Sequence, residues 1–170
     1  MSVYTRSPIR QASFFSYPSF SSASHTISAN NSSRGTDAYV QKLHRLGLPA
    51  APEDFLTSAD ATIAYLKKTY DNALCYVCGT ESLKGQLRAA GLRVSDTLCD
   101  EINILLLGYD TELTYQKLED CCILLGRGVD YIATHPDFVC PTWYGFAPDC
   151  GSVIEMLDTA STSRMFFRIH

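Results

Sequence analysis

The sequence predicts an α/β fold with a mostly parallel sheet built from βαβ units. Three short, continuously apolar stretches, at 74–79, 102–107 and 129–133, are expected to form buried strands. Segments of about a dozen residues with helical periodicity separate them. Apolar strands of this kind are typical of a parallel sheet covered by helices on both faces. The carboxyl ends of such strands lie along one edge, where open α/β sheets bind ligands.

Composition and charge exclude several classes of partner. The chain has 170 residues, of which 46% are hydrophobic and 19% charged, as in a soluble globular domain. No apolar run approaches the ~20 residues needed to cross a bilayer, so we expect no membrane partner. All 18 acidic residues follow position 36, whereas only nine of the 14 basic residues lie in 37–163. The resulting net charge of −9 for this segment argues against binding to nucleic acid.

The cysteines favour a reducing compartment. There are seven of them, an odd number, and no secretory signal precedes the globular part. We therefore expect a cytoplasmic protein. Cys75 and Cys78 lie three residues apart in one predicted strand, hence on opposite faces, and no second pair at similar spacing completes a zinc site. We interpret both as core residues.

The residues before position 28 show neither a helical nor a strand period. Ser, Phe, Tyr and Arg alternate there, interrupted by Pro8 and Pro18. We interpret residues 1–27 as an unstructured or out-of-frame leader. A Ser- and Arg-rich, acid-poor N-terminus is also typical of an organelle transit peptide, which is the alternative interpretation.

Two amphipathic helices are expected before the first strand. One begins at Thr36 as N-cap and ends at Gly47, and the other begins at Ser58. Their apolar positions include Leu43, Leu46, Ile63 and Leu66. Without the strands that such helices normally cover, we expect these four side chains to be exposed and to favour aggregation.

Further helices are expected after the first two strands, with Thr80 and Thr114 as N-caps. Proline, tryptophan and glycine interrupt residues 138–148, which are expected to be irregular. A last helix is expected to open at Gly151-Ser152, and residues 163–170 show no usable pattern.

The stretch 126–137, G-R-G-V-D-Y-I-A-T-H-P-D, is the predicted ligand loop. His135 and Asp137 follow the third strand, and Tyr109 and Asp110 follow the second. A histidine and a carboxylate on a strand-end loop suit acid–base or ligand roles. The alternative, given equal weight, is a loop tightened by Asp side-chain hydrogen bonds around Pro136.

Upstream, the polar run Asn30-Asn31-Ser32-Ser33 leads into the first expected helix. Its backbone N–H groups and the helix dipole suit an anion. Runs of this composition more often serve only as caps and turns.

Together these motifs resemble the haloacid dehalogenase-like phosphatases, in the branch of NagD and the p-nitrophenylphosphatases. The resemblance covers about residues 28–160 in the family's order. The matching motifs are Asn30-Asn31-Ser32-Ser33, Leu46-Gly47-Leu48-Pro49, Thr57-Ser58-Ala59, Val77-Cys78-Gly79, Gly108-Tyr109-Asp110, Leu113 to Leu118, Gly128 to Asp137, and Pro148 to Ser152.

This resemblance implies a Rossmann-like core with an inserted α/β cap, and Mg²⁺-dependent hydrolysis of a small phosphorylated metabolite. Residues 28–70 would be partial core, 71–147 the cap, and 148–170 a partial core helix with an aberrant tail. The cap is expected to form a homodimer. The expected substrate contacts are Asn30, Asn31, Ser32, Tyr109, Asp110, His135 and Asp137.

The sequence also departs from the family pattern. It contains no Asp-x-Asp for the nucleophile and no Gly-Asp for the Mg²⁺ site, and its last lysine is Lys117. Ala29 replaces the hydroxyl residue before the paired asparagines, and His135 replaces the asparagine before the loop proline. We therefore expect a truncated phosphatase without catalytic or metal residues, inactive alone. The alternative is a non-catalytic binding or dimerisation module made of the cap.

Overall fold

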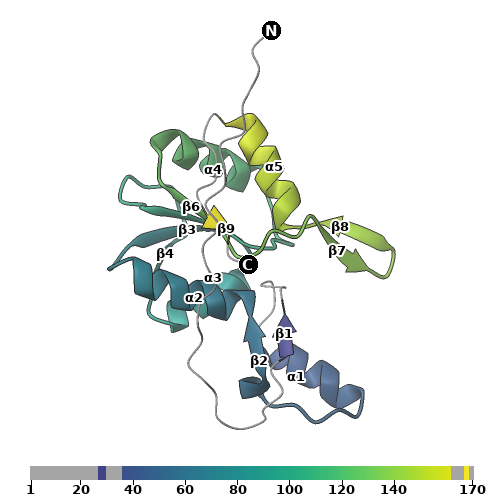
Figure 1. The fold of residues 1–170 in the computed structure, drawn as a ribbon. Coiled ribbons are helices and arrows are strands. Elements are labelled where there is room, and N and C mark those ends of the chain that lie inside the picture. The colour runs from purple at the N-terminus through teal and green to yellow at the C-terminus, as the bar shows by residue number, and fades with distance from the viewer. Residues whose placement is uncertain (1–26, 30–35, 162–166, 169–170) are drawn as a thin grey trace.

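A parallel five-stranded sheet forms the centre of the protein. The computed structural model describes residues 27–29, 36–161 and 167–168. The strand order is β4-β3-β5-β6-β9 (Figure 1). These strands span Arg93–Ser95, Leu74–Cys78, Ile104–Leu107, Asp130–Ala133 and Phe167–Arg168, respectively. The predicted fold class and the three predicted strands are confirmed, while β4 and β9 are additional.

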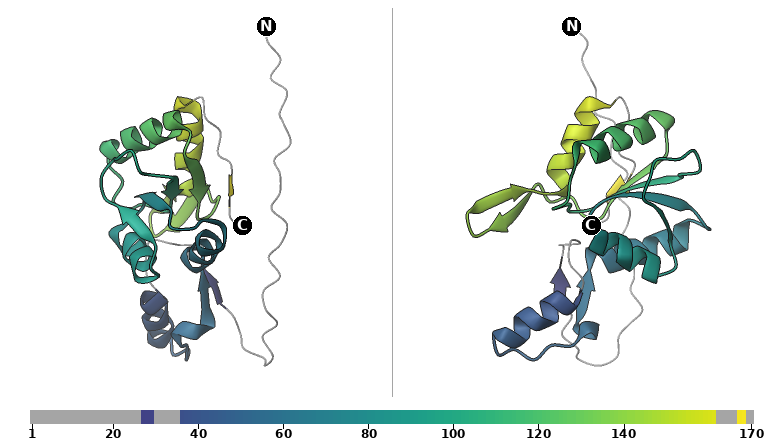
Figure 2. Two further views of the ribbon diagram at one scale, coloured as in Figure 1. Left: turned by 90° about the vertical axis from the view of Figure 1, so that its left-hand side faces the viewer. Right: turned by 180° about the vertical axis from the view of Figure 1, so that it is seen from behind.

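Helices cover both faces of this sheet. Helices α2 (Ser58–Thr69) and α3 (Glu81–Ala89) lie on one face, and α4 (Tyr115–Arg127) and α5 (Cys150–Ala160) on the other (Figures 1 and 2). The side chains of β3 alternate between the two resulting cores. Cys75 packs under α2 and α3, whereas Cys78 packs under α4 and α5. The two cysteines therefore point to opposite faces, as predicted from their spacing.

Threonine caps start the helices beside the sheet. The Thr80 side chain accepts a hydrogen bond from the backbone of α3, and Thr114 does the same for α4, as predicted. Helix α4 ends at Gly128, whose φ of 75° lies in the left-handed region that favours glycine. The cap of α2 is Thr57, one residue before the predicted Ser58. Thr57 Oγ1 accepts from the Asp60 backbone at 3.1 Å.

Helices α2 and α5 pack directly on the central sheet. Leu66 of α2 is 1% exposed, and Ile63 packs against the same core. The expectation that both are exposed was wrong, because the strands they cover are those of this sheet. Ile154 of α5 is likewise buried against the opposite face. The predicted domain boundaries at 70/71 and 147/148 thus fall within one layered unit, and the division into cap and core stays a prediction.

The N-terminal elements form a separate small layer. Strand β1 (Ile27–Ala29) pairs in parallel with β2 (Phe55–Thr57), and the 3₁₀ helix η1 (Pro52–Asp54) precedes β2. Helix α1 (Thr36–Arg45) packs beside them, with the Tyr39 and Phe55 rings 5.8 Å apart (Figure 2). Leu46, after α1, is 65% exposed, as predicted.

An antiparallel hairpin projects from the carboxyl side of the sheet. Strands β7 (Val139–Thr142) and β8 (Gly145–Pro148) form it (Figure 1). The expectation of irregular structure over 138–148 was wrong. The two prolines concealed the hairpin, but edge strands tolerate proline because one side of each strand needs no ladder hydrogen bond. Among the described residues, no helix is long and apolar enough to cross a membrane.

Candidate functional site

The strand ends of β3, β5 and β6 lie side by side at the carboxyl edge of the sheet. Cys78 pairs with Leu107, and Leu107 with Ala133. The hydrogen bonds continue one residue further, since Gly108 N donates to Cys78 O at 2.9 Å and Thr134 N to Leu107 O at 2.8 Å. This edge therefore brings together the loops that carry four predicted site residues, namely Tyr109, Asp110, His135 and Asp137.

His135 forms a buried pair with Asp149, the N-cap of α5. His135 is 2% exposed, and its Nε2 lies 3.0 Å from Asp149 Oδ1. A carboxylate only accepts hydrogen bonds, so Nε2 carries the proton and donates. On the other side of the ring, Nδ1 lies 2.9 Å from Thr134 Oγ1. Both ring nitrogens thus have partners inside the protein.

Asp149 is the principal residue that the sequence did not identify as part of the site. Its Oδ1 also accepts from Cys150 N at 2.6 Å, which starts α5 one residue before the predicted Gly151. An aspartate before a helix is a common N-cap, and this was the available sequence signal. Nothing in the local pattern shows that its partner is His135, 14 residues earlier.

Asp110 is held by Lys117 rather than left available to a ligand. Lys117 Nζ donates to Asp110 Oδ2 at 2.7 Å, to Gly79 O at 3.0 Å and to Glu112 O at 3.1 Å. Asp110 Oδ1 accepts from Glu112 N at 2.8 Å, and the Asp110 side chain is only 2% exposed. Both oxygens are engaged, so this geometry favours a positioning role for Asp110 over direct contact with a ligand.

The loop at Asp137 is fastened to the start of α5. Asp137 O accepts from Gly151 N at 2.7 Å. A Cβ at Gly151 would lie 2.4 Å from Pro136 O, closer than any real contact, so only glycine allows this approach. The His135–Asp149 pair and the Asp137–Gly151 bond together join the β6 loop to α5.

Tyr109 and Cys150 are both neutral side chains under ordinary conditions. Burial, a hydrogen bond to Cys140 and nearby charge, Asp149 included, raise the pKa of Tyr109 to about 12. Burial raises the pKa of the Cys150 thiol to about 12, and the thiol donates to Leu107 O at 3.6 Å. Cys150 is therefore not a ready nucleophile, since the thiolate is the reactive form.

The remaining predicted site residues, Asn30, Asn31 and Ser32, lie outside the described residues. Their role in anion binding stays a prediction.

The carboxylates of Asp110 and Asp149 do not fit a Mg²⁺ site. Mg²⁺ requires near-octahedral oxygen coordination. Both carboxylate oxygens of Asp110 already accept hydrogen bonds. Asp149 lies beside His135 and Cys150, which offer nitrogen and sulfur rather than oxygen.

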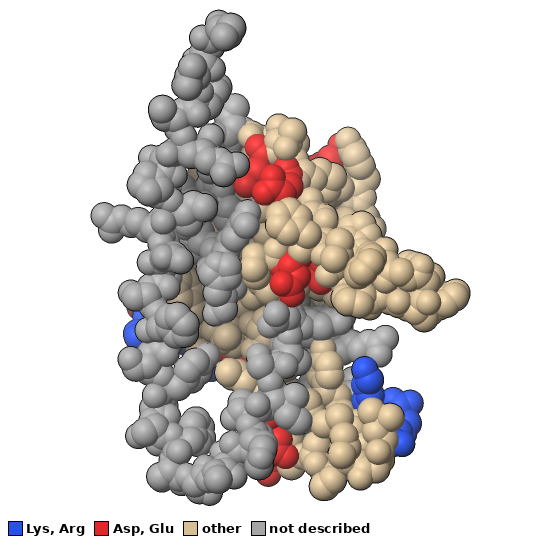
Figure 3. All heavy atoms as spheres, turned by 45° about the vertical axis from the view of Figure 1, so that its right-hand side comes forward, with Lys and Arg blue, Asp and Glu red and all other residues tan. Residues whose placement is uncertain are grey.

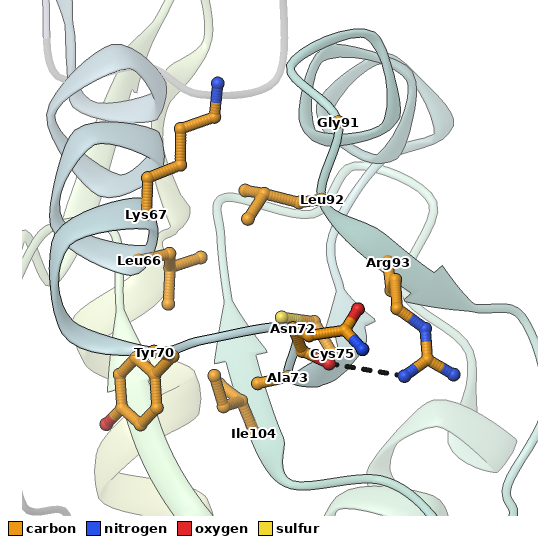
Figure 4. Close-up of a pocket in the computed structure, with 10 residues that line it drawn as sticks. All are labelled: Leu66, Lys67, Tyr70, Asn72, Ala73, Cys75, Gly91, Leu92, Arg93 and Ile104. Atoms are coloured by element: carbon orange, nitrogen blue, oxygen red, sulfur yellow. Dashed lines mark hydrogen bonds between the residues drawn. The ribbon is translucent and has the colours of Figure 1, made fainter.

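A cavity of about 160 Å³ lies at the other end of the sheet (Figure 4). Its wall includes Leu66 and Lys67 near the end of α2, and Leu92 and Arg93 at the start of β4. Arg93 donates to Asn72 O at 3.2 Å there. Because the cavity opens near the amino ends of the strands, it is distinct from the predicted ligand edge.

Comparison with known proteins identifies related chains. The sequence family described as haloacid dehalogenase-like hydrolase matches residues 20–93. An acid sugar phosphatase of Staphylococcus haemolyticus (strain JCSC1435) is 30% identical over 150 residues, which cover 88% of this chain and 56% of the relative. An acid sugar phosphatase of Staphylococcus epidermidis (strain ATCC 12228 / FDA PCI 1200) is 29% identical, covering 88% and 57%. The chain thus spans little more than half the length of these relatives.

Solved structures agree. The 4-nitrophenylphosphatase of Thermotoga maritima superposes with a TM-score of 0.77 at 33% identity, covering 85% of this chain and 54% of that one. A putative nagD protein gives a TM-score of 0.79 at 32% identity, covering 85% and 56%. A glycerol phosphate phosphatase of Mycobacterium tuberculosis, crystallised with magnesium, gives 0.78 at 27% identity, covering 84% and 44%. In both sequence and fold, the chain matches the haloacid dehalogenase-like hydrolases, in the branch of NagD and the p-nitrophenylphosphatases.

Proposed function

We propose that this chain carries the substrate-selecting part of a phosphatase that acts on small phosphorylated metabolites, sugar phosphates being the first class to test. The observation that carries the proposal is the joined carboxyl edge, where Tyr109 and His135 stand on neighbouring strand-end loops. The names of the relatives, acid sugar phosphatase and 4-nitrophenylphosphatase, support the substrate class.

The chemistry of these side chains suits selection rather than bond cleavage. Tyr109 offers a neutral hydroxyl, which can donate to or accept from a sugar hydroxyl. The buried pair formed by His135 and Asp149 fixes the shape of the loop beside it. Phosphoryl transfer in this family needs a nucleophilic carboxylate, and the sequence has no Asp-x-Asp. We therefore propose that the chain alone does not turn over phosphate esters.

Turnover of p-nitrophenyl phosphate tests this proposal. The purified chain is incubated with the ester and Mg²⁺, and release of p-nitrophenol is followed. No release above a buffer control is expected, and an activity that persists through purification would refute the proposed inactivity. Substrate selection is tested separately by following backbone amide NMR signals during addition of glucose 6-phosphate. Shifts confined to the loops after β5 and β6 support it, and unchanged signals contradict it.

A second candidate function is a non-catalytic module that dimerises. The hairpin favours it, because its aromatic side chains are widely exposed: Trp143 is 95%, Tyr144 63% and Phe146 70% exposed. Residues 138–148 contain no Lys, Arg, Asp or Glu, and the hairpin accordingly projects as an uncharged surface (Figure 3). Two such hairpins can meet without like-charge repulsion, and their contact would bury apolar surface.

Sedimentation tests the dimer. The full chain is expected to sediment as a dimer at micromolar concentration, and the double variant W143S/F146S as a monomer with an unchanged circular dichroism spectrum. Ile123→Ser and Met156→Ser, at exposed positions on α4 and α5, are matched controls that should leave the dimer intact. A monomeric wild-type chain would contradict the proposal.

A further inference from the structure

Three metal-ligating side chains of different chemistry meet where β6 ends and α5 begins. His135, Asp149 and Cys150 are each at most 6% exposed. Their potential ligand atoms, a ring nitrogen, a carboxylate oxygen and a thiol sulfur, all lie within 4.8 Å of one another. Around a tetrahedral Zn²⁺ with bond lengths of roughly 2.0 to 2.3 Å, ligand atoms lie about 3.3 to 3.8 Å from one another, so only a small contraction of the cluster is needed.

The backbone fixes this cluster in place. Asp149 and Cys150 are the cap and first residue of α5, so their relative orientation is set by the helix start. His135 is held beside them because the loop after β6 approaches the backbone at Gly151. Rigid elements on both sides position the ligand atoms, as metal sites require.

His135 and Asp149 each already have a hydrogen-bond partner other than the three ligand atoms. Thr134 Oγ1 lies 2.9 Å from His135 Nδ1 and can accept a proton held there while Nε2 binds an ion. The backbone of Cys150 donates to Asp149 Oδ1 at 2.6 Å, which orients the carboxylate. Ligating histidines and carboxylates in proteins are typically oriented by partners of this kind.

We propose that His135, Asp149 and Cys150 form a binding site for a borderline divalent transition-metal ion, of which Zn²⁺ is the reference case. Imidazole and thiolate select such ions over Mg²⁺. Three protein ligands leave a fourth tetrahedral position for a water molecule.

Binding changes the hydrogen bonding within the cluster in a defined way. The Cys150 thiol releases its proton to solvent and the sulfur leaves Leu107 O. The proton on His135 Nε2 is lost while Nδ1 takes one up, so the ring stays neutral and Nδ1 donates to Thr134. The bond between His135 and Asp149 is replaced by two bonds to the same ion. One proton is released overall for each ion bound.

Co²⁺ is the probe that tests the proposal most directly. The reduced full-length chain, freed of metal by a chelator, is titrated with Co²⁺ and then with Zn²⁺. We expect one ion per chain, a thiolate-to-cobalt charge-transfer band, the intense visible bands of tetrahedral cobalt, and displacement of both by Zn²⁺. Absence of a charge-transfer band in the folded wild-type chain would overturn the proposal without any variant.

Variants assign the ligands. Cys150→Ser should abolish the charge-transfer band, and His135→Asn should weaken Zn²⁺ binding by more than about tenfold. Cys140→Ser, at a half-buried cysteine on β7, is the matched control and should bind as the wild type does. A band that survives in Cys150→Ser but disappears in Cys140→Ser would overturn the assignment. Near-ultraviolet circular dichroism identifies any ligand variant that fails to fold. Asp149→Asn, which keeps the shape of the cap, is then used in place of that variant. None of these readouts depends on phosphatase activity, so they fail or succeed independently of the proposed function.

Discussion

Lys117 Nζ lies 2.7 Å from Asp110 Oδ2, and this ion pair holds the loop after β5 against the start of α4. The same ammonium group donates to Gly79 O at the end of β3. One side chain therefore connects two strand ends and a helix. The Asp110 carboxylate is 2% exposed and Lys117 is 15% exposed, so the pair is shielded from most of the solvent.

Removing the ammonium group should destabilise the fold. Lys117→Met keeps the aliphatic chain but leaves a buried carboxylate without its cation, which costs about 2–4 kcal/mol. Urea denaturation followed by circular dichroism measures the free energy of unfolding. Lys67→Met, at an exposed position on α2, is the matched control and should change that free energy by less than about 0.5 kcal/mol. Equal effects of the two substitutions would show that the Asp110 pair contributes nothing specific.

Adding one methyl group at Gly151 should be strongly unfavourable. Its Cβ would lie 2.4 Å from Pro136 O and 2.9 Å from Asp137 O, and backbone atoms cannot move aside without shifting the loop. We expect Gly151→Ala to lower the free energy of unfolding by about 2–3 kcal/mol. Gly126 lies in the exposed part of α4, and a Cβ added there would meet no neighbouring atom within 4 Å. Gly126→Ala should therefore raise the free energy of unfolding by about 0.5–1 kcal/mol. A neutral Gly151→Ala substitution would contradict the close approach.

Stability should fall at high pH through Tyr109. Its pKa in the folded protein is raised to about 12, above the value of about 10 in an unfolded chain. The folded state therefore holds the phenolic proton more tightly. This contribution to stability is fully present below about pH 10 and is lost as the pH rises to about 12. The test compares unfolding free energies of the wild type and Tyr109→Phe across this range. The wild-type curve should fall more steeply, and parallel curves would contradict the raised pKa.

Substitutions at Asp149 separate its shape from its charge. Asp149→Asn keeps an oxygen that can accept from both Cys150 N and His135, so a loss of less than about 1 kcal/mol is expected. Asp149→Ala removes the cap and leaves His135 Nε2 buried without its acceptor, which should cost about 2–3 kcal/mol. Thermal and urea unfolding of both variants check the order. An Asn variant as unstable as the Ala variant would indicate that the carboxylate charge is essential.

Periodicity predicted most of the central unit correctly. Apolar runs over β3, β5 and β6 predicted buried parallel strands, and Thr80 and Thr114 predicted two helix starts, because both signals are local. The hairpin and β4 were not predicted. Strand β4 has only three residues, with an exposed Arg93 at its start, and is held by its pairing with β3. Such short edge strands have little pattern of their own.

The positions of the candidate site residues in the fold were predicted, but their contacts were not. Strand-end logic correctly brought Tyr109, Asp110, His135 and Asp137 to one edge. It could not show that Asp110 is engaged by Lys117, or that His135 pairs with Asp149. Those partners lie 7 and 14 residues away, and only the tertiary packing of α4 and α5 brings them into contact.

The bond between Asp137 and Gly151 also constrains how the loop after β6 could change during evolution. Loop insertions are a common route to altered specificity, because exposed loops tolerate changes in length. Here the loop after β6 is fixed to the start of α5 at both His135 and Asp137. An inserted residue would break two contacts at once. Variation in this loop is therefore expected to proceed by exchange of side chains at fixed loop length.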